Sequence, residues 1–326
     1  MLEFPPLNPL QESSMAASVT LALIPKSAGN PYFDNIAQGF SWGCKTLECE
    51  LTTVAPEKAE AASQIPLVAA QIEHRVDIIA IAPNSPTALA PVLDEARRQN
   101  ILVLAVNSDM PGSQNSRDAA ILPVDFSIVA PSLLELLGAT LQYEGDFAIL
   151  STTPEAPDQN AWIADIKRLL AQQRQYARMK LVTVVYGNDD ARKSLAEAKM
   201  LLERYPKLKG IMAPTSVGLT AAAQAVSADA KVGRVKVTGL GMPNQMRRFV
   251  DNGTVTAFQL WSPYNVGLLA AHFAVGVRRG NIRNKPGKTF TVPGLEKKFK
   301  VLERSMIYAH DCLRTFDRQN IAQFNF

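Results

Sequence analysis

The sequence contains few of the residues on which catalytic and metal centres depend. It has three histidines, His74, His272 and His310, and three cysteines in 326 residues. None of them falls in an HExxH, CxxC or similar metal-ligand spacing. No serine lies in a GxSxG turn, so there is no sign of a nucleophile elbow. We therefore expect a protein that is not an enzyme, with no cofactor and no catalytic or metal-binding residues.

The glycine patterns of nucleotide-binding proteins are also incomplete. PGKT at 286–289 resembles the end of a phosphate-binding loop, but six residues separate Gly280 from Gly287 where the motif has four. GLG at 239–241 lacks the third glycine of a dinucleotide fingerprint. The net charge of +4 argues neither for nor against nucleic acid by itself. Without a supporting motif, we expect no nucleic-acid partner.

Long apolar runs are absent too. No run approaches the roughly 20 apolar residues that span a bilayer, and a hydrophobic fraction of 47% is ordinary for a soluble globular protein. Residues 1–17 show no basic segment followed by an apolar one, so no signal peptide is visible there. We expect residues 1–17 to be a disordered leader.

Cysteine gives little guidance. Cys44 falls on the apolar face of an expected helix, which favours a buried free thiol. A bridge between Cys44 and Cys49 is the alternative, although three cysteines do not suggest a disulfide framework.

What the sequence does contain is a repeated alternation of strand and helix patterns. Short apolar runs typical of strands alternate with apolar stripes of helical period. The first set of strands is expected at residues 19–24, 50–54, 76–82 and 101–106. The second set is expected at residues 147–150, 181–185, 210–213, 235–239 and 255–260. Such alternation indicates α/β architecture with parallel sheets, and two sets indicate two doubly wound lobes.

Small polar residues follow many of the expected strands. These segments are PKSAGN (25–30), APNS (82–85), VNSD (106–109), STTPEAPDQN (151–160), VYGNDD (185–190), APTS (213–216) and GLGMPN (239–244). Each one alone is explained by turn and cap preferences. Ligands of such sheets bind beyond the carboxyl ends of the strands, however, so seven such segments favour a polar cleft between two lobes. Amides, hydroxyls and carboxylates with aromatic rings nearby suit a sugar; the rings expected there are Tyr32, Phe33, Trp162, Tyr186 and Trp261.

Longer segments resemble the periplasmic sugar-binding proteins of ribose-type (type I) fold, within their rhamnose-binding and autoinducer-2-binding branch. The matching segments include NPYFDNIAQGF, DQNAW, IMAPTSVG, GLGMPNQMRRFV and the closing NIAQFNF. The resemblance runs from about residue 19 to the C-terminus. It implies two lobes joined by a three-strand hinge that close on a ligand without catalysis.

The resemblance also implies a division of the chain and a function. We expect lobe 1 at 18–124 plus 262–292 and lobe 2 at 125–261 plus 293–326. The expected function is that of a solute-binding protein of an ABC-type importer that closes on a small sugar, rhamnose-like or another aldose. Its expected partners are a membrane permease and an ATPase, its location is periplasmic or at the cell surface, and we expect a monomer.

Several site residues follow from this resemblance. Lys26, Asp158, Gln159 and Pro214 match positions that contact the furanosyl autoinducer in the receptor group. Together with the polar strand ends, the expected ligand-binding set is Lys26, Asn30, Tyr32, Phe33 and Asn107 from lobe 1, and Asp158, Gln159, Asn160, Pro214, Thr215, Ser216 and Trp261 from lobe 2 and its hinge.

Two positions depart from the receptor pattern. Asn107 stands where an aspartate is expected, and Ser216 stands where the group has alanine. An amide makes a weaker bond to a hydroxyl than a carboxylate does, which suggests a different or more weakly bound ligand. PTSVG at 214–218 is close to the PTTVG of the rhamnose group and favours a deoxyhexose.

Two other functions remain open at this point. One is an autoinducer-2 receptor for uptake or signalling. The other is a ligand-sensing regulatory module like the effector domain of LacI-type repressors. Such repressors carry a helix-turn-helix domain before the first strand, and only 18 residues precede Val19 here, so we expect at most a truncated repressor.

Overall fold

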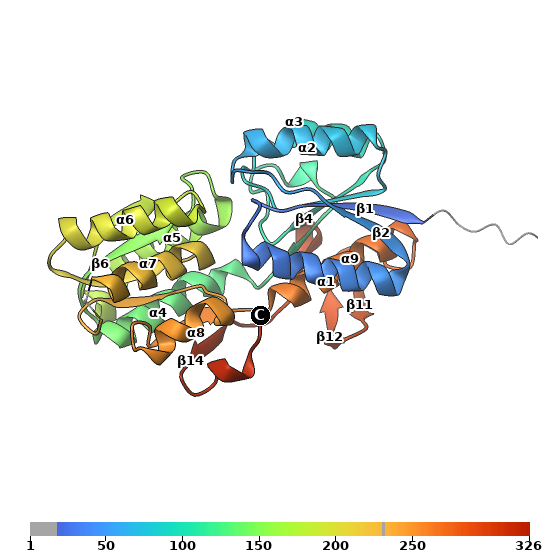
Figure 1. The fold of residues 1–326 in the computed structure, drawn as a ribbon. Coiled ribbons are helices and arrows are strands. Elements are labelled where there is room, and N and C mark those ends of the chain that lie inside the picture. The colour runs from blue at the N-terminus through green and yellow to red at the C-terminus, as the bar shows by residue number, and fades with distance from the viewer. Residues whose placement is uncertain (1–17, 230–231) are drawn as a thin grey trace, which may run out of the picture.

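The computed structural model describes residues 18–229 and 232–326. The leader expected at residues 1–17 lies outside these ranges. Figure 1 shows two α/β lobes side by side, each built on its own sheet. The predicted fold class, two lobes with parallel sheets, is confirmed.

The first lobe contains a six-stranded sheet in the order β13-β5-β4-β3-β1-β2, in which every pair is parallel. The strands are β1 (Val19–Ile24), β2 (Cys49–Thr53), β3 (Ile78–Ile81), β4 (Leu102–Val106), β5 (Ala119–Leu122) and β13 (Met306–Tyr308). Helices α1 (Pro31–Leu47) and α9 (Pro263–Arg278) lie on one face, and α2 (Ala61–Glu73) and α3 (Ala90–Arg98) on the other (Figure 1). Because both faces are covered, β3 is buried at all four positions.

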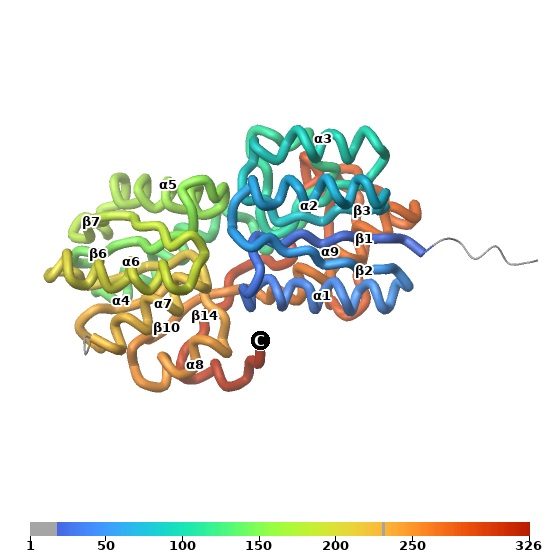
Figure 2. Tube along the Cα trace, turned by 45° about the horizontal axis from the view of Figure 1, so that its top comes forward, coloured from blue at the N-terminus to red at the C-terminus, as the bar shows by residue number. Residues whose placement is uncertain are grey.

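Helices α1 and α9 run side by side and approach each other through glycines (Figure 2). A Cβ added at Gly39 would lie 2.1 Å from the carbonyl oxygen of Tyr264, and one at Gly267 would lie 2.0 Å from that of Ile36. Only glycine permits this approach, because any side chain would collide with backbone atoms. The contact fixes the position of α1, whose first turn faces the second lobe.

The second lobe has a four-stranded parallel sheet in the order β7-β6-β8-β9. Its strands are β6 (Glu144–Ser151), β7 (Arg178–Tyr186), β8 (Leu208–Ala213) and β9 (Lys236–Gly239). The helices of this lobe are α4 (Val129–Leu141), α5 (Pro157–Gln172), α6 (Ala191–Arg204), α7 (Ser216–Ala228) and α8 (Pro243–Asp251). Helix α4 packs on α5, and α6 packs on α7.

One expected parallel strand pairs differently. Strand β10 (Ala257–Leu260) pairs antiparallel with β14 (Arg314–Asp317). It also lies beside β9, through an isolated parallel bridge between Leu240 and Gln259 and a hydrogen bond from the hydroxyl of Thr238 to the carbonyl oxygen of Ala257 (3.0 Å). The expected parallel neighbour of this strand is therefore present, but its antiparallel partner was not expected. The alternation cannot show it, because the partner strand comes from the far end of the chain.

The chain passes between the lobes three times: after β5, after β10 and after β13. Before the last passage it forms an antiparallel hairpin of β11 (Thr289–Val292) and β12 (Leu295–Lys300). Strand β13 then pairs in parallel with β5 of the first lobe. Assigning all of 293–326 to lobe 2 was therefore wrong for β13. A three-residue strand is too short to show a periodicity.

Cys44 and Cys49 form a disulfide, so the interpretation of Cys44 as a free thiol was wrong. Helix α1 ends at Leu47, and Glu48 adopts a left-handed conformation with φ of 51°. The chain reverses there, so the Cα atoms of the two cysteines lie 4.8 Å apart. Cys312 is free and exposed. Within the described ranges, no helix has the length and apolar character needed to cross a bilayer.

Candidate functional site

A cavity with about 50 Å³ of open space lies between the lobes, at the carboxyl ends of the strands. The lining residues are Lys26, Asn30, Tyr32, Phe33, Asn107, Thr152, Asp158, Gln159, Trp162, Asp189, Pro214, Thr215, Ser216, Leu240, Leu260 and Trp261. Both lobes contribute, as a ligand that draws them together requires.

The structure brings together all but one of the twelve residues expected at the site. The exception is Asn160, whose Nδ2 donates a hydrogen bond to the carbonyl oxygen of Pro154 (2.6 Å). Asn160 is on the first turns of α5 together with Asp158 and Gln159, but it is not part of the cavity wall. Tyr186, an aromatic residue expected nearby, is not on the wall either.

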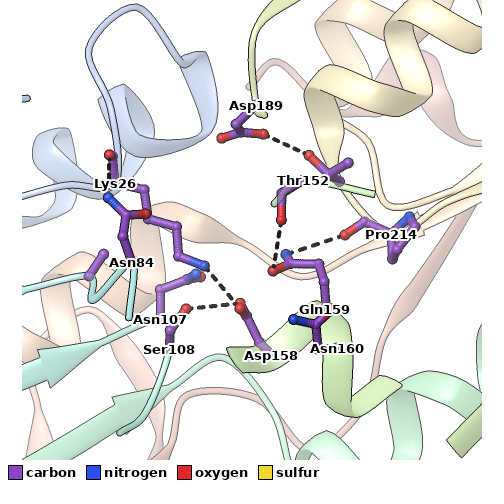
Figure 3. Close-up of polar contacts among 12 residues, drawn as sticks. Lys26, Asn84, Asn107, Ser108, Thr152, Asp158, Gln159, Asn160, Asp189 and Pro214 are labelled. Atoms are coloured by element: carbon purple, nitrogen blue, oxygen red, sulfur yellow. Dashed lines mark hydrogen bonds and ion pairs between the residues drawn. The ribbon is translucent and has the colours of Figure 1, made fainter. Parts of the chain in front are cut away.

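Asp158 links the lobes at the centre of the site (Figure 3). Its Oδ1 lies 2.9 Å from the Nζ of Lys26, which follows β1, and its Oδ2 accepts a 2.8 Å hydrogen bond from the hydroxyl of Ser108, which follows β4. The side chains of Lys26 and Asp158 are only 6% and 2% exposed. Asp158 also lies in the first turn of α5, where the helix dipole favours a negative charge.

A second series of side-chain hydrogen bonds connects the hinge to the first lobe. The indole Nε1 of Trp261 donates to the hydroxyl of Tyr32 at 2.6 Å, and that hydroxyl donates to Oδ1 of Asn107. Burial raises the pKa of Tyr32, so its hydroxyl stays protonated and acts as a donor. Asn107 has φ of 69°, a left-handed conformation that asparagine tolerates better than most residues.

The amide of Gln159 is held loosely by its neighbours. Its Nε2 lies 3.5 Å from the carbonyl oxygen of Pro214, and the hydroxyl of Thr152 lies 3.4 Å from its Oε1 (Figure 3). Both distances are long for hydrogen bonds, so this amide can exchange partners at little cost. Thr215 and Ser216 lie beside it at the start of α7.

Asp189 is a site residue that the sequence reasoning missed. It follows β7, and its carboxylate accepts hydrogen bonds from Nδ2 of Asn30 (2.8 Å) and from the hydroxyl of Thr215 (2.9 Å). Burial raises the pKa of Asp189. The segment VYGNDD was recognised as a polar strand end, but it offers two adjacent aspartates. One of them, Asp190, instead caps α6 by accepting from the backbone N of Lys193 at 2.7 Å.

Apolar surface completes the wall. The rings of Trp162 and Trp261 meet edge to face with centroids 6.4 Å apart. Leu240 and Leu260, at the ends of the lobe 2 strands, also line the cavity and were not expected there. Within the described ranges, no group of three or more His, Cys, Asp or Glu residues is placed to hold a metal ion.

This combination of a two-lobed fold and an interlobe cavity has a counterpart in known sequences. Residues 21–282 match the family of the periplasmic binding protein domain. This chain belongs to the periplasmic binding protein family. Membership implies a periplasmic location and confirms the resemblance seen in the sequence.

Three relatives illustrate the similarity of this periplasmic binding protein to known ones. A D-ribose/D-allose-binding protein of Pseudomonas aeruginosa is 28% identical over 250 residues, 73% of this chain and 75% of the relative. An ABC transporter solute-binding protein from Clostridium phytofermentas with bound L-rhamnose is 32% identical, with a TM-score of 0.89 over 94% of this chain and 98% of that one. LsrB from Clostridium saccharobutylicum in complex with AI-2 is 18% identical, with a TM-score of 0.88 over 94% and 100% of the two chains, and shows the fold alone. These relatives are binding proteins, not enzymes.

Proposed function

We propose that this chain is the solute-binding protein of an ABC-type importer, and that it closes on one small aldose, with a 6-deoxyhexose such as L-rhamnose as the first candidate. The observation that carries the proposal is the interlobe cavity, where polar groups from both lobes converge beside aromatic and apolar side chains. Hydroxyls of a sugar need donors and acceptors, and its C–H face packs on rings.

The similarity to the rhamnose-bound protein supports this choice of sugar. It is 32% identical to this chain along nearly the whole length of both. Leu240, Leu260 and Trp162 provide apolar surface on the lobe 2 side, which suits the methyl group of a deoxyhexose. Trp261 on the hinge offers a further ring face.

The mechanism that we propose is ligand-induced hinge closure. Asp158 and Asp189, both of the second lobe, accept hydrogen bonds from Lys26, Ser108 and Asn30 of the first lobe. A ligand that contacts both lobes binds the closed form better than the open one, and it shifts the equilibrium by that difference in affinity. The closed form is then the one presented to a permease and its ATPase. We propose that the protein acts as a monomer.

The proposal is tested by isothermal titration calorimetry with L-rhamnose, D-ribose, D-allose, D-arabinose and D-fucose. We expect one-to-one binding of at least one of them, and recovery of the sugar chemically unchanged after long incubation. Failure to bind any aldose would contradict the proposed function. A sugar altered at a rate that depends on the protein would show an enzyme instead.

A second candidate is reception of autoinducer-2. Four residues at matching positions, Lys26, Asp158, Gln159 and Pro214, all lie on the cavity wall. Asn107 and Ser216 depart from that pattern, and both also line the cavity. We therefore favour a sugar. Including autoinducer-2 in the titration separates the two candidates.

A further inference from the structure

We propose that Asp189 contacts the ligand directly and makes the site select uncharged sugars over sugars that carry a carboxylate. This inference rests on the proposed function, because it concerns the sugar class that the same cavity accepts. It begins with the backbone. Asn188 and Asp189 have φ of 55° and 53°, so two consecutive non-glycine residues are left-handed. Asparagine and aspartate adopt this conformation more readily than other non-glycine residues.

Asp189 does not supply the cap of the helix that follows it. The cap of α6 is supplied by the next residue, Asp190, through its bond to Lys193. The carboxylate of Asp189 instead lies on the cavity wall, where it accepts hydrogen bonds from Asn30 of the first lobe and Thr215 of the second. Each of its oxygens accepts one hydrogen bond from these residues. A carboxylate has about four acceptor positions, so capacity remains for ligand hydroxyls.

The charges on the cavity wall explain the selectivity. Among the wall residues, all of which are described, Lys26 is the one cation, and it pairs with Asp158 at 2.9 Å. Asp189 receives only neutral donors, so the wall carries one positive and two negative side chains. A hydroxyl gives such a carboxylate a charge-assisted hydrogen bond. A ligand carboxylate would add like-charge repulsion in a poorly solvated space.

The test uses sugars that share a ring and differ at one carbon. L-rhamnose, L-mannose and L-mannuronate carry a methyl, a hydroxymethyl and a carboxylate at the same position, and D-fucose, D-galactose and D-galacturonate form the equivalent series. The selectivity is the ratio of the affinities for the hydroxymethyl and carboxylate members, which are of similar bulk. In wild type we expect this ratio to be about tenfold or more.

The decisive variant is Asp189→Asn, which removes the charge and keeps the shape. We expect the affinity of this variant for the uncharged sugar to fall by about tenfold. We also expect its ratio of affinities for the hydroxymethyl and carboxylate sugars to be about fivefold smaller than that of wild type. Asp190→Asn is the matched control, because asparagine caps a helix as well as aspartate does and Asp190 is not on this cavity wall. We expect its affinities to stay within about twofold of wild type.

Three outcomes would overturn the inference. One is a wild type that binds the carboxylate sugar as tightly as its uncharged partner. Another is an Asp189→Asn variant that keeps the wild-type affinity and selectivity. The third is binding of neither series by wild type. Binding of another aldose of the calorimetric panel would then leave the proposed function standing, and binding of no aldose would overturn both. If the variant does not fold, wild type alone decides, through the ratio of its affinities for the hydroxymethyl and carboxylate sugars.

Discussion

Lys26 of the first lobe and Asp158 of the second form a buried salt bridge across the cleft, with 2.9 Å between Nζ and Oδ1. Ser108 donates to the other oxygen of the same carboxylate. The pair is desolvated, so removing either partner leaves a buried charge without compensation. Asp158 therefore joins the two lobes, and we propose that its remaining acceptor capacity serves a ligand.

The first prediction concerns Asp158→Ala. Loss of this acceptor, together with the unpaired Lys26 that remains, should weaken sugar binding by about 2–5 kcal/mol, which is more than tenfold in affinity. Calorimetry measures the affinity, and circular dichroism checks that the fold is kept. Asp165→Ala on the same helix is the control, because Asp165 is at the surface and pairs with Arg168. Unchanged affinity in Asp158→Ala would remove Asp158 from the site.

The second prediction concerns Asn107→Asp, which installs the carboxylate that autoinducer receptors have. The Tyr32 hydroxyl donates to Oδ1 of Asn107, which leaves Nδ2 as a donor for a ligand oxygen. An ionised aspartate offers acceptors only. We expect sugar affinity to fall by about 1–3 kcal/mol. The proposal that this site is adapted to a sugar would be contradicted by tight autoinducer-2 binding in wild type. It would also be contradicted if the variant gained autoinducer-2 binding while neither protein bound a sugar.

The third prediction is a pH dependence that Asp189 confers. Burial raises its pKa above the usual value of about 4, and the titratable groups that face it are Lys26 and Asp158. As the pH falls through the raised pKa, Asp189 loses its charge, and affinity for an uncharged sugar should fall. The Asp189→Asn variant should lack this component. Calorimetric titrations of wild type and Asp189→Asn with the sugar at several pH values, in matched buffers, measure this pH dependence of the affinity.

The same pKa shift predicts an effect of opposite sign on the ligand-free protein. The carboxyl of Asp189 binds its proton more tightly in the folded state than in the unfolded state. Between the two pKa values the folded state therefore holds more protons, and the contribution of this group to the free energy of unfolding rises as the pH falls. Urea unfolding at several pH values should show wild type gaining stability relative to Asp189→Asn on acidification. A constant difference between the two proteins would contradict the raised pKa.

The fourth prediction concerns the packing of α1 on α9. In Gly39→Ala the new Cβ would lie 2.1 Å from the carbonyl oxygen of Tyr264, so the two helices must separate. Overpacking of this kind costs about 1–3 kcal/mol or more of unfolding free energy. Ser41→Ala on the exposed side of α1 should change it by less than about 0.5 kcal/mol. Urea denaturation compares the two, and equal stabilities would show that the helices move apart without cost.

The sequence predicted the parts of the fold that depend on local patterns. Strand β1 was expected at residues 19–24 and is observed at Val19–Ile24, because a strand buried on both faces is a short continuous apolar run. Helix α9 was missed because residues 266–276 are all buried, so it has no polar face to reveal its period. Helix α4 was also missed, although Val129, Leu133 and Leu137 repeat at helical spacing. The apolar spacing of α4 could therefore have been recognised in the sequence.

Cavity-wall residues could be predicted from the sequence where a polar side chain also lies at the end of a strand or the start of the next helix. Lys26, Asn107 and Asp158 each follow a strand directly or begin the next helix, so their side chains lie at the carboxyl edges of the two sheets, on either side of the cavity. Leu240 and Leu260 could not be recognised, since an apolar residue at a strand end looks like core. Asn160 was expected at the site but does not line the cavity. Neighbours on a helix face different directions, and only the rotation of α5 decides which of them reaches the cavity.

The central claim is that one sugar is bound by both lobes in the interlobe cavity. The most direct test is a crystal structure of the protein with the tightest-binding aldose of the calorimetric panel. We predict that the sugar lies in this cavity, with hydroxyls bonded to Asn107 of the first lobe and to Asp158 of the second. A sugar bound elsewhere, or bound by one lobe only, would contradict the account.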